Sequence, residues 1–275
     1  MRALPLRPVV FLLALAAVTI ADDNPAALWQ SSFLAALNAA SAKDYAKAEQ
    51  LFAKTIAVAE RLPPGDARLG LTLNTLGLVY KEEKKYAEAE KVLQRSLEIL
   101  EKASGPESLD AGNVNYNLAS VLLASGHGES ALPHILKCRP IYLKILGPDS
   151  LKAVTTLCMT GEAYRIMKKY IEAEGALKQC ADAREASGGV ENPELADALF
   201  NLGLVYQQEG RYALADPALK MAEIIREVTL GVTSPEFADA LEAHAALLRT
   251  MGRTPEADKD DAMAAAVRRS ARKAQ

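Results

Sequence analysis

The sequence predicts an all-α fold, a solenoid of about six helix pairs, and three observations lead to it. Nearly identical eighteen-residue stretches begin at Leu76 and Leu202, which lie 126 residues apart. That distance is three times 42, and two weaker copies lie between them at the same spacing. Within a copy the apolar residues follow helical spacing, and glycines recur every 42 residues. Together these features indicate one repeated helical module.

Residues 1–21 differ from the rest of the chain. Arg2 and Arg7 flank the start of an uncharged apolar run that ends at Ile20, and an acidic pair follows. This layout is typical of a secretory signal peptide. The run from Pro8 to Ile20 is shorter than the roughly 20 residues that span a bilayer. We expect bacterial-type export to the periplasm or the medium, without stable membrane insertion afterwards; the alternative is tethering by an uncleaved N-terminal segment.

Each repeat unit contains two helices separated by a polar break, as in KEEKK at 81–85. A small residue recurs where the two helices must cross closely, and it lets their axes approach to about 8–10 Å. These residues are Ala89, Ala131, Ala173, Ala215 and Ala257. The expected solenoid covers 22–267, with units near 29–60, 70–103, 112–145, 154–187, 196–229 and 238–267, followed by a basic C-terminal tail at 268–275.

Glycines mark the exits of four units, at Gly105, Gly147, Gly189 and Gly231. A left-handed glycine at this place would end one helix and reverse the chain. Proline next to Ser, Asn, Asp or Glu follows each glycine, which is typical of a helix N-terminus. The basic stretch 268–273 is expected at a helix end, where the dipole favours cations; a patch for acidic lipid is the alternative.

The pattern Leu76, Gly77, Tyr80, Ala89 and Leu93 resembles the tetratricopeptide repeat. The 42-residue period is similar to the kinesin-light-chain subtype, although only halves of the linker of that subtype are present here. The resemblance extends over about residues 29–267. It implies a right-handed superhelical solenoid and a non-catalytic role in protein–protein interaction.

The chain has three cysteines, Cys138, Cys158 and Cys180, an odd number that argues against a disulfide-stapled scaffold. Cys138 and Cys180 lie one repeat apart, beyond the roughly 7 Å between Cα atoms that a disulfide allows. Only Cys158 is placed to pair with either of them. We expect buried free thiols, with a Cys158 disulfide as the alternative.

Composition and motifs argue against several functions. The chain has 32 Lys and Arg against 35 Asp and Glu, so it lacks the basic surplus of a nucleic-acid-binding protein. GHGES at 126–130 lies at a turn between helices and is no nucleophile elbow. His127 and His134 are seven residues apart, whereas a helical zinc pair is spaced by three or four. His244 stands where other units carry Leu or Thr, which indicates a packed histidine. We therefore expect no catalytic residues, no cofactor and no metal ligand.

The resemblance places the first helix of each unit on a concave groove. The groove candidates on these helices are Asn74, Lys81, Tyr116, Asn117, Met159, Arg165, Phe200, Asn201, Leu204 and Arg249. An Asn amide both donates and accepts, so it can match the backbone of an extended peptide. The alternative role for these Asn residues is hydrogen bonding between neighbouring helices.

The function expected from these features is an exported scaffold or adaptor that binds a protein or peptide segment in its concave groove. A self-assembling structural solenoid of the cell envelope is the first alternative. A hydrolase or metal-dependent enzyme with an unrecognised site is the remote one.

Overall fold

The computed structural model describes residues 24–189 and 192–273, so the predicted signal peptide lies outside the described residues. The described part contains twelve helices in six pairs and no strand, which confirms the expected all-α repeat fold. The chain divides into two compact units, one ending at Pro64 and one beginning at Gly65. The helices are α1 (Pro25–Ser41), α2 (Tyr45–Ala59), α3 (Arg68–Glu82), α4 (Tyr86–Ser104), α5 (Leu109–Ala124), α6 (Gly128–Leu146), α7 (Leu151–Ile166), α8 (Tyr170–Gly188), α9 (Pro193–Gln208), α10 (Tyr212–Leu230), α11 (Pro235–Thr250) and α12 (Thr254–Lys273).

The first unit is the single helix pair α1 and α2. Asn24 caps α1 through its side chain, with Pro25 in the first turn, and Asp44 caps α2. An aromatic cluster holds the pair together: Trp29 stacks on Phe33 at 4.9 Å between ring centroids, and Phe33 meets the fully buried Phe52 edge to face.

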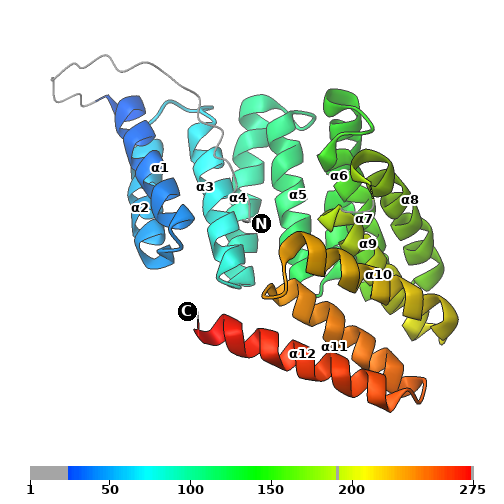
Figure 1. Cartoon of the computed structure of the whole chain (residues 1–275). Helices are drawn as coiled ribbons and strands as arrows, with labels where there is room; N and C mark the ends of the chain where they lie inside the picture. Colours follow the sequence, from blue (N-terminus) through cyan, green and yellow to red (C-terminus); the bar gives the residue numbers. More distant parts are fainter. Residues whose placement is uncertain (1–23, 190–191, 274–275) are drawn as a thin grey trace. The chain divides into compact units, whose positions relative to one another are not determined.

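The second unit stacks five helix pairs in sequence order, from α3 and α4 to α11 and α12 (Figure 1). Each helix packs against the next one along the chain. The helix direction turns along the stack: α3 and α4 run from top to bottom of the view, whereas α11 and α12 lie across it (Figure 1). Such nearest-neighbour packing distributes the hydrophobic core along the array.

Small residues lie at every crossing within a pair, as the repeat pattern predicts. The alanines from Ala89 to Ala257 in this series are all fully buried. Three glycines on the first helices face leucines on the second helices still more closely. A Cβ added to Gly161 would lie 2.4 Å from Cγ of Leu177, and Gly77 and Gly203 meet Leu93 and Leu219 in the same way. The glycines therefore set how closely the two helices approach.

The exit glycines adopt backbone angles that only glycine tolerates well. Gly105, Gly147 and Gly231 have φ of 91°, 89° and 87°. Their ψ values of 155°, 162° and 160° are extended, so they are not in the left-handed helical region that the sequence pattern suggested. The extended ψ directs the chain away from the finished helix and toward the Ser, Asn or Pro that starts the next one.

The turns inside the pairs form a second series with positive φ. Gly126 and Gly210 occupy it with φ of 81° and 73°, and Lys84 and Lys168 occupy it with 60° and 59°. In GHGES at 126–130, Gly126 and His127 therefore lie in the helix–helix turn expected from the phase of the repeat, and Gly128 begins α6.

The predicted basic tail at the C-terminus belongs largely to the last helix, α12. α12 continues to Lys273, so the basic stretch 268–273 forms the end of this helix, as expected. The half-buried Arg268 forms ion pairs with Asp239 and Glu242 of α11, which anchor this end of the helix. Among the described residues, no helix is both long and apolar enough to cross a membrane.

Candidate functional site

The candidate surface is the layer made by the first helices of the second unit, α3, α5, α7, α9 and α11. Each of these helices contacts the next member of the layer, whereas no two second helices of successive pairs show comparable contact among the described residues. Since one side of the stack is closer packed than the other, the layer of first helices lies on the inside of the curve. We call it the first-helix layer.

Two predicted groove residues join α3 to α5. The Asn117 side chain donates from Nδ2 to Oδ1 of Asn74 over 2.8 Å, and both residues are half-buried. This bond is of the kind expected if the asparagines order the stack. It leaves the Nδ2 group of Asn74 and the Oδ1 atom of Asn117 unused, so each amide keeps hydrogen-bonding capacity.

A similar link joins α7 to α9. Arg165 donates from Nε to Oδ1 of Asn201 over 3.0 Å, and Nδ2 of Asn201 donates to the backbone oxygen of Asp197. Phe200 directly precedes Asn201, and the guanidinium of Arg226 lies over its ring, 4.4 Å from the centroid. The amide of Asn201 is therefore already engaged on both sides, and Phe200 offers only part of its ring.

The apolar candidates differ in how much surface they present. Tyr116 is half-buried, with its ring edge to face with Tyr142 at 6.1 Å, and burial raises the pKa of its hydroxyl. Leu204 is also half-buried. Met159 is only 7% exposed and packs in a core cluster with Ala119 and Leu122, so it presents little area to a ligand.

The charged candidates lie in different surroundings. Burial raises the pKa of the Glu162 carboxyl on α7, while the charges of Arg165 and of Lys81 on α3 act in the opposite direction. Lys81, Glu162 and Arg165 are therefore close enough to interact electrostatically within the first-helix layer. Arg249 instead pairs with Asp258 and Asp261 of α12, so a ligand would have to compete with two carboxylates for it.

The structure shows a paired position that sequence reasoning missed. In four of the five pairs of the second unit, one residue on the first helix contacts the residue 29 positions later on the second helix, and in the α3–α4 pair the equivalent residues belong to the same hydrophobic cluster. The pair is apolar in Leu71 and Leu100 and hydrogen-bonded in the next two units. It becomes an ion pair in the last two. The full series is Leu71/Leu100, Asn113/Tyr142, Thr155/Arg184, Asp197/Arg226 and Asp239/Arg268.

The cysteine expectation is corrected by a disulfide between Cys158 on α7 and Cys180 on α8, whose Cα atoms lie 5.2 Å apart. The two helices of one pair face each other, so the bond closes across the hairpin and not between repeats. Cys138 is free and buried as expected, and burial raises the pKa of its thiol to about 12. That thiol is therefore protonated and unreactive at neutral pH.

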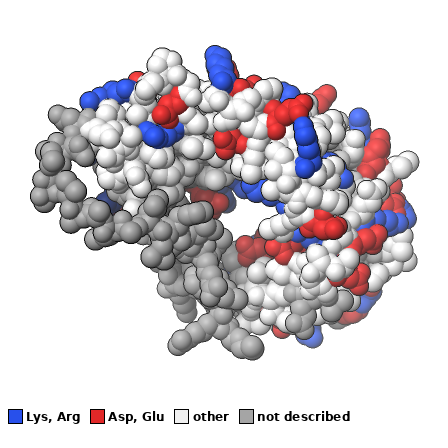
Figure 2. Space-filling view, turned by 90° about the horizontal axis from the view of Figure 1, so that it is seen from above, with Lys and Arg blue, Asp and Glu red and all other residues white. Residues whose placement is uncertain are grey.

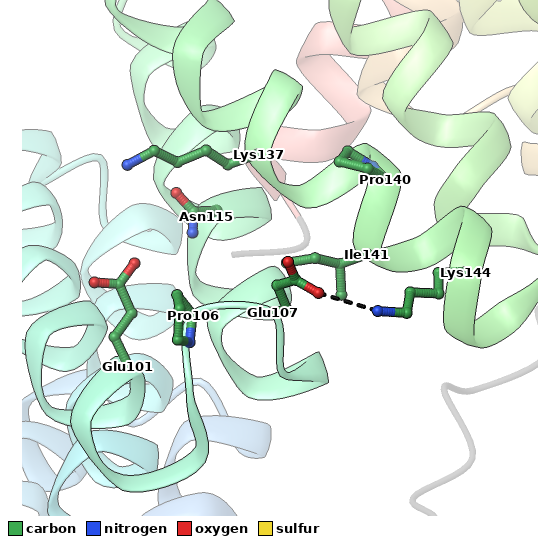
Figure 3. Close-up of a pocket in the computed structure, with 8 residues that line it drawn as sticks. All are labelled: Glu101, Pro106, Glu107, Asn115, Lys137, Pro140, Ile141 and Lys144. Carbon is green, nitrogen blue, oxygen red and sulfur yellow. Dashed lines mark hydrogen bonds and ion pairs between the residues drawn. The ribbon is translucent and has the colours of Figure 1, made fainter.

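A surface pocket of about 350 Å³ lies between the end of α4, α5 and α6 (Figure 3). Lys144 and Glu107 form an ion pair of 3.0 Å at its edge (Figure 3). The amide of Asn115 is bound by the Ala111 backbone oxygen and by His134. Glu107 and Lys144 are the lining residues that pair with one another, and the lining contains no nucleophile next to a general base.

The charge distribution matches the near-neutral composition. On the face shown in Figure 2, Lys and Arg are interspersed with Asp and Glu. This mixture differs from the continuous basic stripe on which phosphate-backbone binding depends.

Repeated helix pairs, invariant small residues at the crossings and glycine exits define a helical repeat solenoid. A model of the tetratricopeptide repeat matches residues 25–102, 110–186 and 161–227, which together make up more than half of the chain. The chain belongs to the tetratricopeptide repeat family.

The relatives confirm the fold and leave the partner open. A segment of 118 residues, 41% of this chain, is 32% identical to the clustered mitochondria protein homolog of Debaryomyces hansenii, of which it covers 9%. The kinesin light chain repeats of Podosopora anserina have a TM-score of 0.60 at 19% identity, with 78% of this chain and 100% of that chain covered. A Rap protein complexed with competence and sporulation factor has a TM-score of 0.57 at 16% identity, with 92% and 79% covered.

Proposed function

We propose that this chain is an exported, non-catalytic scaffold that binds an extended segment of a partner protein along the first-helix layer. The observation that carries the proposal is the series of amide and charged side chains on successive first helices, from Asn74 to Arg165 and Asn201. Asn117 and Asn201 lie 84 residues apart, twice the 42-residue repeat, and Asn74 and Arg165 lie on the neighbouring first helices, so hydrogen-bonding groups recur along one surface.

The arrangement of these amide groups suits hydrogen bonding to the backbone of a bound peptide more than recognition of a particular peptide side chain. Asn74 and Asn117 each keep one hydrogen-bonding group outside their mutual bond. Tyr116, next to Asn117, and Leu204, one turn from Asn201, are half-exposed and would contact apolar side chains of the bound segment. Solved relatives support recognition as a use of this fold, since the similar Rap protein is complexed with competence and sporulation factor.

Two features support export. Residues 1–21 have the layout of a signal peptide. The Cys158–Cys180 disulfide is of a kind that persists in oxidising compartments and is rare where thiols are kept reduced. On this proposal the mature chain begins near Asp22, and mass spectrometry of the protein recovered from the envelope fraction tests it. Recovery of an intact Met1 would favour the tethered alternative.

The binding test compares two faces of the second unit. Mature wild-type chain and the Asn117→Ala/Asn201→Ala variant serve as bait in the native envelope fraction. Leu136→Ser on α6, with Leu136 60% exposed, is the control on the second helices. We expect loss of specific partners with the double variant and retention with the control, at unchanged helical content by circular dichroism. Equal capture by all three baits would refute binding at the first-helix layer.

Self-assembly is the second candidate because α10 exposes an apolar stripe. Leu214, Met221, Ile224 and Val228 lie on one helical face and are 44%, 46%, 42% and 63% exposed. Patches of this kind commonly mark contact surfaces. Light scattering on the purified chain and on its Ile224→Ser variant separates a monomeric adaptor from an assembly. A wild-type mass that is a multiple of the chain mass, together with a lower mass for the variant, would favour assembly.

A further inference from the structure

A buried polar cluster joins α10, α11 and α12, away from the first-helix candidates. His244 on α11 lies at its centre, 5% exposed in its side chain. Its Nδ1 atom is 2.8 Å from Oδ2 of Asp260 on α12 and 3.3 Å from Oε2 of Glu223 on α10. Its Nε2 atom is 2.9 Å from Oδ1 of Asp216, also on α10. The imidazole therefore has carboxylates on both sides.

The cluster is short of hydrogen-bond donors. Lys220 donates to Oε1 of Glu223 over 2.6 Å, but Oε2 of the same carboxylate has no hydrogen-bond partner. The Glu223 side chain is only 7% exposed, so bulk water does not compensate for the missing bond. A single proton on Nδ1 of His244 points to one oxygen at a time. Two buried carboxylate oxygens thus converge on one donor.

A divalent cation would satisfy all three of these atoms at once. We propose that Glu223 Oε2, His244 Nδ1 and Asp260 Oδ2 form a binding site for a transition-metal ion of the Zn²⁺ class. The three ligand atoms lie within 4.8 Å of one another. Tetrahedral zinc with bonds of about 2.0–2.2 Å places its ligand atoms roughly 3.3 Å apart. The closest pair, Nδ1 of His244 and Oδ2 of Asp260 at 2.8 Å, would therefore have to separate by about half an ångström.

The surroundings of His244 also fit this assignment. In the tautomer with the proton on Nε2, His244 donates a hydrogen bond from Nε2 to Oδ1 of Asp216, which leaves the lone pair of Nδ1 directed at the site. A carboxylate behind a histidine ligand is the common arrangement in zinc proteins. An imidazole with two carboxylates suits Zn²⁺ better than Ca²⁺ or Mg²⁺, which prefer oxygen ligands.

Access and charge are consistent with an ion. A pocket of about 320 Å³ opens onto Asp216, His244 and Asp260, and a solvent molecule there would complete the coordination. Lys220 and Arg253 contact the same carboxylates and offset part of their negative charge. The ion would join three helices from the last two pairs and so stabilise the C-terminal end of the array, independently of partner binding.

Calorimetric titration of the chelator-treated full chain with ZnCl₂ tests the site. We expect one zinc per chain and a raised melting temperature. Glu223→Gln and Asp260→Asn each remove one ligand charge with little change in shape, and each should weaken zinc binding at least ~10-fold. His127→Gln, at an exposed turn histidine, is the matched control and should bind like wild type. Circular dichroism shows whether each variant is folded.

Co²⁺ provides a second readout that does not depend on stability. A tetrahedral or five-coordinate site gives an intense visible absorption band, and Asp260→Asn should diminish that band. The absence of stoichiometric zinc binding would overturn the proposal and leave His244 as an imidazolium held by its carboxylates. Zinc binding that is unchanged in both ligand variants would overturn it as well.

Discussion

Gly161→Ala tests whether the close approach of helices in a pair requires glycine. The added Cβ would lie 2.4 Å from Cγ, 2.8 Å from Cδ2 and 3.1 Å from the backbone nitrogen of Leu177. Ordinary contacts between carbon atoms are about 3.5–4.0 Å, so α7 and α8 would have to separate by roughly 1 Å or Leu177 would have to leave its rotamer.

Two opposing effects decide the magnitude. Overpacking of a core costs about 1–3 kcal/mol. Alanine in a helix interior recovers about 1 kcal/mol relative to glycine. We therefore expect a net loss of about 1 kcal/mol and at most about 2 kcal/mol, which lowers the melting temperature by roughly 2–8 °C. Thermal unfolding followed by far-ultraviolet circular dichroism measures this loss.

Gly175→Ala on α8 is the matched control because nothing lies within 4 Å of its added Cβ. Only the gain in helix propensity remains there, so we expect stabilisation by about 0.5–1 kcal/mol. Leu177→Ile added to Gly161→Ala recreates the Ala119/Ile135 pair of α5 and α6 and should recover part of the loss. A melting temperature that rises equally in both alanine variants would refute the packing argument.

Three further predictions concern the turns, the charges and the disulfide. Gly147→Ala should cost about 1–3 kcal/mol by urea unfolding because φ is 89° there, and an unchanged midpoint would contradict the strain. Hydrogen bonds, chiefly from Arg211, lower the pKa of the Glu174 carboxyl to about 2. The ionised carboxylate therefore stabilises the folded protein above the unfolded-state pKa of about 4.3, and this stabilisation is lost as the pH falls toward 2. In an acid titration of unfolding, the Glu174→Gln variant should lose less stability than the wild type. Reduction of Cys158–Cys180, which closes a loop of 22 residues, should lower stability by about 3 kcal/mol; equal melting temperatures with and without dithiothreitol would contradict this.

Most of the fold was predictable because the repeat imposes the same constraints several times. Crossing alanines, glycine exits and polar breaks at a constant spacing locate the helix boundaries without knowledge of any contact. The extended ψ of Gly147 was not predictable, since glycine tolerates several conformations with positive φ. The ion pairs that join Arg268 to α11 were not predictable, because they depend on which residues of α11 face α12.

The candidate site was less predictable than the fold. Phase in the repeat correctly placed Asn117 and Asn201 on the first helices. It did not predict their hydrogen-bond partners, because these depend on side-chain rotamers. The Cys158–Cys180 pairing was predicted only as the alternative, because the phase of Cys180 was compared between repeats and not across its own hairpin. The recurring 29-residue separation in Asp197/Arg226 was visible in the sequence and is the signal that could have revealed the paired position.

That paired position constrains how such arrays can be recombined. Both partners belong to the same helix pair, so a chimera joined at Gly147 or Gly231 carries each pair over intact. A chimera joined at the turn within a pair would set Arg226 opposite a leucine such as Leu71 and bury its charge without a carboxylate. We therefore expect exchange of whole helix pairs to preserve stability and exchange of single helices to lower it. The glycine exits are accordingly the positions at which the array can be lengthened, shortened or reordered.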